Sequence, residues 1–196
     1  MTRRFAALRE ALLNLLYPRR AVCMGCGSML GCDRDDLCEE CWARLAKNWI
    51  GASAPSGGRT SIDGAACAYA YPGPAGALAR NLKYRGVWVL ARDMGADVAR
   101  AAALLRLPPV KFVAAVPMHP KRLRRRGKNH AELLARRAAE CLELDYADIL
   151  LRTRDAPQQA RLGAGARRKS PQGGFAVRQE CRSAVAGADV LLIDDV

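Results

Sequence analysis

Two uninterrupted apolar runs dominate the pattern of hydrophobic and polar positions along the chain. Residues 112–116 read Phe-Val-Ala-Ala-Val and residues 190–193 read Val-Leu-Leu-Ile, with no polar position inside either run. Such runs are typical of strands that are buried on both faces of a parallel sheet. Shorter runs at residues 64–71 and 149–151 predict two more strands.

Amphipathic periodicity predicts helices between these strands. It spans residues 75–84 and the alanine-rich residues 87–105, and it resumes with Leu134, Ala138 and Leu142. Strands that alternate with helices predict an α/β fold, in which a parallel sheet has flanking helices.

A further amphipathic helix is expected at residues 3–16, where Pro18 ends it. We expect its apolar face to dock onto the domain that follows. Binding to a membrane surface is the alternative.

Four cysteines near the N-terminus form a specific metal-binding pattern. Two residues separate Cys23 from Cys26 and Cys38 from Cys41, and eleven residues lie between the pairs. Two such knuckles can bring four sulfurs to one tetrahedral Zn²⁺, and a site with four thiolates is structural because it has no open position for catalysis. Unligated thiols and redox pairs are the alternatives. Cys32, between the pairs, is expected to be a spare thiol.

The segment after the cysteines predicts a helix and then a linker. Trp42, Leu45 and Trp49 form a helical stripe, and residues 51–61 are rich in Gly, Ser and Pro. The expected organisation is an N-terminal helix and zinc-ribbon domain at residues 1–50, a linker at 51–63 and an α/β domain at 64–196.

The overall charge of the chain is strongly positive. A formal net charge of +13 accompanies 51% hydrophobic residues. This composition excludes a wholly disordered chain, and the charge implies an anionic partner, which is nucleic acid, a phosphorylated small molecule or an acidic protein surface. No apolar run is long enough to span a membrane and no signal peptide is evident, so we expect a soluble, cytoplasmic protein.

A dense basic run follows the first apolar run. Six of the eight residues from Lys121 to Lys128 are Lys or Arg. We expect an anion-binding loop there, because it lies beyond the carboxyl end of a predicted parallel strand, where α/β sheets bind ligands. A solvated helix face is the alternative. His119 and His130 are secondary candidates for acid/base groups, since the sequence shows no carboxylate partner for either.

Two adjacent acids follow the second apolar run. Asp194 and Asp195 can accept hydrogen bonds from a vicinal diol or hold a hydrated Mg²⁺. The alternative is a strand that ends in a charged turn. Upstream, the polar and basic residues 158–173 are expected either to close over a bound anion or to form a flexible surface loop.

The order of these motifs resembles the ComF family, in which a zinc ribbon precedes a type I phosphoribosyltransferase-like domain. The resemblance covers nearly the whole chain. The matching segments are the two cysteine pairs, Leu82-Lys83-Tyr84-Arg85-Gly86, Val116-Pro117, Arg126-Gly127-x-Asn129, Arg152-Thr153-Arg154, Gln159, Arg168, Gly174-Phe175 and Leu191-Leu192-Ile193-Asp194-Asp195-Val196. Lys128 and His130 stand where the family usually has Phe and Gln, and Ser170-Pro171 replaces an Asn-containing step.

The resemblance implies a phosphoribosyl pyrophosphate site. Asp194 and Asp195 would face the ribose as catalytic residues, and Mg²⁺ would accompany the ligand. The expected anion-binding residues are Lys83, Arg125, Arg126, Gly127, Lys128 and Asn129. The family's Thr-Thr-Gly turn, which cradles the 5′-phosphate, does not follow Asp195 here. We therefore expect the C-terminal part of the fold to be missing and this chain of 196 residues to be inactive as a transferase.

The resemblance further implies a role in natural competence, where imported single-stranded DNA is handled beside a helicase-like partner. The alternative function is a non-catalytic zinc-ribbon accessory protein that binds single-stranded DNA or a protein partner.

Overall fold

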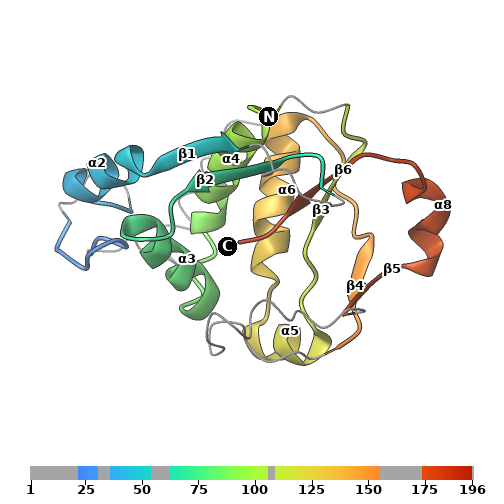
Figure 1. Cartoon of the computed structure of the whole chain (residues 1–196). Coiled ribbons are helices and arrows are strands. Elements are labelled where there is room, and N and C mark those ends of the chain that lie inside the picture. The colour runs from blue at the N-terminus through green and yellow to red at the C-terminus, as the bar shows by residue number, and fades with distance from the viewer. Residues whose placement is uncertain (1–21, 31–35, 54–61, 106–108, 155–173, 196) are drawn as a thin grey trace, which may run out of the picture.

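The computed structural model describes residues 22–30, 36–53, 62–105, 109–154 and 174–195. This part of the chain is a mixed α/β protein (Figure 1). Its helices are α2 (Glu39–Lys47), α3 (Pro74–Tyr84), α4 (Leu90–Ala102), α5 (Pro120–Arg126), α6 (His130–Leu142), the 3-10 helix Gln179–Cys181 and α8 (Arg182–Val185). Its strands are β1 (Trp49–Ser53), β2 (Ala65–Tyr69), β3 (Phe112–Ala115), β4 (Leu150–Arg152), β5 (Phe175–Val177) and β6 (Val190–Ile193). The predicted helix at 3–16, Cys32 and the segment 158–173 lie outside the described residues.

The two long apolar runs form a parallel pair of strands, as predicted. β3 and β6 run side by side, with Phe112 opposite Val190 and Ala115 opposite Ile193 (Figure 1). Helix α6 covers this pair, and Ile193 is buried in the same apolar cluster as the alanines of α6. The other face of β6 is open, because Leu192 is half exposed. The expectation that this strand is buried on both faces is therefore wrong.

The remaining strands do not join this parallel sheet. β2 pairs antiparallel with β1, and β4 pairs antiparallel with β5. Among the described residues, an isolated parallel bridge between Tyr146 and Val113 is the only further pairing with β3 and β6. The parallel sheet of the described residues is thus small, because an apolar run predicts a strand but does not determine which strand it pairs with.

Strand β1 occupies the start of the segment that was predicted to be a linker. Gly51 lies opposite Cys67 and Ser53 opposite Ala65 in the β1–β2 pair. Trp49 belongs to this strand rather than to the predicted helical stripe, and its ring packs edge-on against Tyr69 with 5.2 Å between centroids. The aromatic pair across the strands stabilises the pairing of β1 with β2.

Helices α4 and α6 pack tightly against each other. Gly95 makes this possible, because a Cβ at that position would lie 2.6 Å from Cβ of Arg137. Alanines dominate the contact on both helices, and Leu134 fills its centre. The predicted helices at 75–84 and 87–105 correspond to α3 and to the shorter α4. No helix of the described residues is long and apolar enough to cross a lipid bilayer.

Candidate functional site

The four predicted zinc ligands converge on one point. The Sγ atoms of Cys23, Cys26, Cys38 and Cys41 all lie within 4.8 Å of one another, and those of Cys26 and Cys38 are 3.8 Å apart. A tetrahedral Zn²⁺ with four thiolate ligands requires sulfur separations of about 3.8 Å. Soft sulfur donors in this geometry fit a structural zinc ion. They are the only such cluster within the described part of the chain.

Local hydrogen bonds favour thiolates at two of these cysteines. The Ser28 hydroxyl lies 3.1 Å from Sγ of Cys26 and lowers the pKa of Cys26 to about 6. At Cys23 burial opposes ionisation, but the N–H groups of Cys38 and Gly25, each 3.3 Å from Sγ, lower its pKa overall. Burial raises the pKa of Cys41 well above its ordinary value. A bound cation would favour the thiolate there, since metal binding displaces the proton.

Glycine is needed beside the metal ligands. A Cβ at Gly25 would lie 2.8 Å from Sγ of Cys41 and 3.1 Å from a methyl group of Leu37. The first knuckle therefore closes over the second only because residue 25 has no side chain.

The ribbon shares its apolar core with the α/β part of the chain. Cys23, Met24 and Leu45 belong to one buried cluster with Leu78 of α3 and Leu90 of α4. The side-chain amide of the buried Asn81, also on α3, donates to the Met24 carbonyl over 2.8 Å. Zinc coordination is thus connected to α3, the helix that ends with Lys83 and Tyr84.

A second group of polar side chains gathers at the carboxyl ends of β3 and β6. Lys83 Nζ, from the last turn of α3, lies 3.2 Å from Oδ1 of Asp195, and both side chains are largely buried. The same lysine lines a small pocket of about 370 Å³ together with Arg125, Arg126 and His130. Lys83 therefore connects the acidic pair to two of the predicted cations.

The two acids of this site have different surroundings. The N–H of Asp195 donates to Oδ1 of Asp194 over 2.8 Å, while the carboxylate of Asp195 pairs with Lys83. Desolvation, and then the charge of Asp195, raise the pKa of Asp194 to about 6. The pair therefore carries less than two full negative charges just below neutral pH.

His130 belongs to this group, because it lines the same pocket as Lys83. Its side chain is 2% exposed and its Nδ1 has no hydrogen-bond partner among the described residues. Burial lowers its pKa, and the charges of Arg126 and Lys83 act in the same direction, whereas Asp195 opposes them. Asp195, more than sixty positions away in the sequence, is thus a carboxylate whose charge acts on His130 without a hydrogen bond to Nδ1.

The basic run forms a helix rather than the predicted loop. Residues 120–126 make α5, which begins with Pro120 after His119 and ends with Arg126, before Gly127, where φ is +80°. The helix separates its cations. Arg125 and Arg126 line the pocket, whereas Arg124 is not part of its lining.

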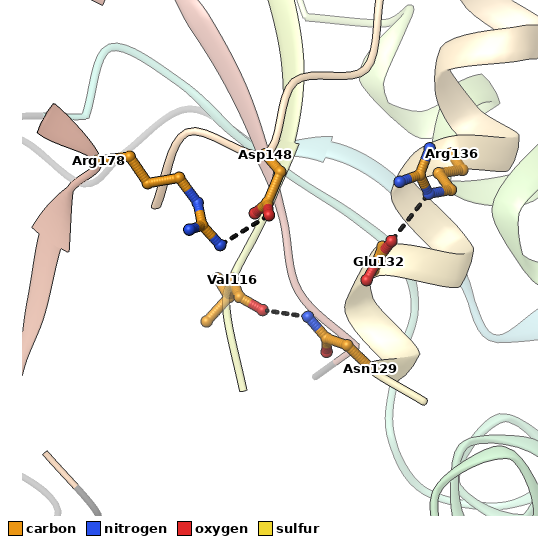
Figure 2. A network of polar contacts seen from close by, with 6 residues as sticks. All are labelled: Val116, Asn129, Glu132, Arg136, Asp148 and Arg178. Carbon is orange, nitrogen blue, oxygen red and sulfur yellow. Dashed lines mark hydrogen bonds and ion pairs between the residues drawn. The ribbon is translucent and has the colours of Figure 1, made fainter. Parts of the chain in front are cut away.

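Asn129 has a structural partner at the end of β3. Its side-chain amide donates to the Val116 carbonyl over 3.1 Å, which fixes the start of α6 against the sheet (Figure 2). Two ion pairs flank this contact, between Arg136 and Glu132 on α6 and between Arg178 and Asp148. Asn129 thus holds the backbone in place beside the pocket.

Two aromatic residues at this pocket were missed by the sequence analysis. Tyr84 and Trp88 both line it, and each carries a cation of the basic run on its ring. The guanidinium carbon of Arg126 is 5.1 Å from the Tyr84 centroid, and Nζ of Lys128 is 4.7 Å from that of Trp88. About forty residues separate each ring from its cation, so no local motif indicates the pairing.

Comparisons with known proteins add information for the N-terminal part of the chain. Neither the curated proteins nor the solved structures contain a match to this sequence. One family matches, and its description is a double zinc ribbon domain. The match includes all four clustered cysteines and continues through β1 into β2. Residues 12–68 are therefore similar to a double zinc ribbon domain, and the four cysteines within them are arranged to bind Zn²⁺.

Proposed function

We propose that this zinc-ribbon protein binds a phosphorylated small molecule of the phosphoribosyl pyrophosphate type in the pocket beside β3 and β6. The observation that carries the proposal is the position of Lys83, which lines one pocket with Arg125 and Arg126 and also pairs with Asp195. Three cations would neutralise the phosphate groups, and the acidic pair would accept the sugar hydroxyls.

The carboxylates also suit the metal that such a ligand brings. Oxygen donors are the ligands that Mg²⁺ prefers, so Asp194 and Asp195 would hold it, and it would add positive charge beside the phosphates. In this proposal the chain's own residues bind and orient the ligand. The resemblance to the ComF family supports the same assignment and extends it to a role in DNA uptake.

Calorimetric titration of the zinc-loaded chain with magnesium pyrophosphate tests the proposal. Saturable binding is expected, and Lys83→Ala and Arg126→Ala should each weaken it about 10-fold, because each removes a charge-assisted contact. Arg124→Ala is the matched control, since Arg124 belongs to the same helix but does not line the pocket. Absence of saturable binding, or equal losses in all three variants, would refute the assignment.

A second candidate is a non-catalytic accessory protein that binds single-stranded DNA. The exposed cations Lys121, Arg124 and Arg125 on α5 favour it. Affinity for single-stranded DNA should fall steeply as the salt concentration rises. Replacing the three cations by alanine should reduce the slope of log affinity against log salt concentration by about one for each phosphate contact that is lost. A salt-independent affinity would exclude this candidate.

A further inference from the structure

We propose that the apolar groove between β2, α4 and β6 is the docking site of the chain's own N-terminal segment, residues 3–16, which binds there as a basic amphipathic helix. The groove has a volume of about 1990 Å³ and is far larger than the phosphate pocket. Sites for small molecules typically measure about 300–1000 Å³. The size of the groove therefore favours an element of secondary structure as its occupant.

The groove exposes apolar side chains that the described residues do not cover. Leu192 of β6 is 50% exposed, Val89 before α4 is 64% exposed, and Ile50 of β1 is 49% exposed, and all three line the groove. Neither apolar cluster of the described residues includes any of them. Apolar side chains that gather in one groove from three elements are typical of a surface that another element covers.

The charge of the groove is opposite to that of the whole chain. Seven aspartates and two cations line it, although the chain has a net charge of +13. Asp63, Asp93 and Asp189 are exposed at this lining. The groove therefore attracts a basic occupant and repels a nucleic acid or an acidic peptide.

The N-terminal segment has the two properties that the groove requires. Phe5, Leu8, Leu12, Leu15 and Leu16 are spaced to form one apolar face of a helix. The same segment has three arginines and one glutamate, so it is basic. As a helix of fourteen residues it would be about 21 Å long. Its apolar face would cover the exposed side chains of the groove, and its arginines would face the aspartates.

The zinc ribbon keeps this segment within reach of the groove. Val22 immediately precedes the zinc ligand Cys23, and the groove lining includes Leu37, which immediately precedes the ligand Cys38. The Sγ atoms of these two ligands lie within 4.8 Å of each other. The connecting residues 17–21 can span up to about 17 Å. The connection is thus long enough for docking and short enough to give the helix a high effective concentration at the groove.

Hydrogen exchange of the zinc-loaded full chain, measured by mass spectrometry, tests the proposal. Amides of residues 3–16 should exchange about 10-fold more slowly than those of an unstructured segment, or slower still. Replacing Asp93 and Asp189 by lysine should reduce this protection about 5-fold, because two ion pairs are lost. Replacing Arg4 and Arg9 by glutamate in the same protein should restore the protection, because the signs of both partners are then exchanged.

Matched variants separate docking in the groove from a general effect of charge or hydrophobicity. Asp145→Lys combined with Glu180→Lys makes the same change of charge at exposed positions outside the groove and should leave the protection of residues 3–16 unchanged. Leu192→Ser should reduce this protection, whereas Leu123→Ser, which replaces an exposed leucine of α5 outside the groove, should not.

Each contrary outcome assigns the groove or the segment differently. Rapid exchange throughout residues 3–16, or equal losses of protection in the groove variants and their controls, would overturn the proposal. Protection that increases with protein concentration would also overturn it and assign the groove to a second copy of the chain. Protection that requires anionic lipid vesicles would overturn it in favour of a segment that binds a membrane surface.

Discussion

Single residues determine how closely the metal ligands can approach one another. Gly25 is the clearest case, because its missing side chain leaves space that Sγ of Cys41 and Leu37 occupy. The four cysteines could be identified as ligands from their spacing, but the need for glycine at position 25 follows from a contact between residues sixteen positions apart.

We predict that Gly25→Ala weakens zinc binding about 10-fold, because the added methyl group pushes the second knuckle away from the first. Competition with a chromophoric chelator measures the affinity. Met29→Ala is a suitable control, since Met29 lies in the same ribbon and is 77% exposed. An unchanged affinity in Gly25→Ala would show that the cluster opens without loss of coordination.

The second prediction at this scale concerns the pH dependence of folding. Burial lowers the pKa of His130 below its ordinary value of 6.5, so the unfolded chain takes up a proton at this residue before the folded chain does. The contribution of His130 to the free energy of unfolding should therefore decrease as the pH falls below about 6.5, whereas the raised pKa of Asp194 contributes in the opposite direction.

Urea denaturation of wild type and of His130→Asn at about pH 7.5 and about pH 5.5 checks this. The free energy of unfolding should decrease less from the higher to the lower pH in His130→Asn than in the wild type. Protonation of the zinc ligands affects both proteins alike, so the difference between the two decreases isolates His130. Equal decreases would contradict the assignment of a neutral, buried imidazole.

At the scale of elements, the close contact between α4 and α6 positions the start of α6, and hence His130, against the sheet. Gly95 is the residue that permits it. Gly within a helix normally destabilises the helix relative to Ala, so its presence here is explained by packing rather than by propensity.

Gly95→Ala should consequently destabilise the protein by about 1–3 kcal/mol, in spite of the better helix propensity of Ala. The new Cβ would lie 2.6 Å from Cβ of Arg137 and 3.0 Å from the Leu134 carbonyl. Chemical denaturation gives the free energy, with Arg92→Ala as the control at an exposed position of α4. A stabilised Gly95→Ala protein would show that the helices can separate freely.

At the scale of the whole molecule, the zinc ribbon and the pocket are connected through α3. The ribbon core includes Leu78 and Leu90, and Asn81 bonds to Met24, while the end of the same helix carries Lys83 into the pocket. A zinc ion held by the four cysteines would therefore stabilise α3 as well as the ribbon.

Removal of zinc by a chelator should increase hydrogen exchange in α3 about tenfold or more, because the ribbon cluster that packs on Leu78 of α3 depends on the metal. Amides of β4 and β5, which pack elsewhere, should change less. Mass-spectrometric exchange measures both segments together. Protection of α3 that is independent of zinc would show that the two parts fold separately.

The sequence by itself determined the parts of this protein whose signals are local. The spacing of Cys23, Cys26, Cys38 and Cys41 was sufficient to predict the metal site, and two unbroken apolar runs were sufficient to predict β3 and β6. The tertiary structure decided which distant residues meet: β2 with β1 rather than with the parallel strands, Lys83 with Asp195, and Tyr84 and Trp88 with the cations of the basic run. The physical reason is that periodicity and ligand spacing act within a few residues, whereas strand pairing, burial and charge pairing depend on how the whole chain closes on itself.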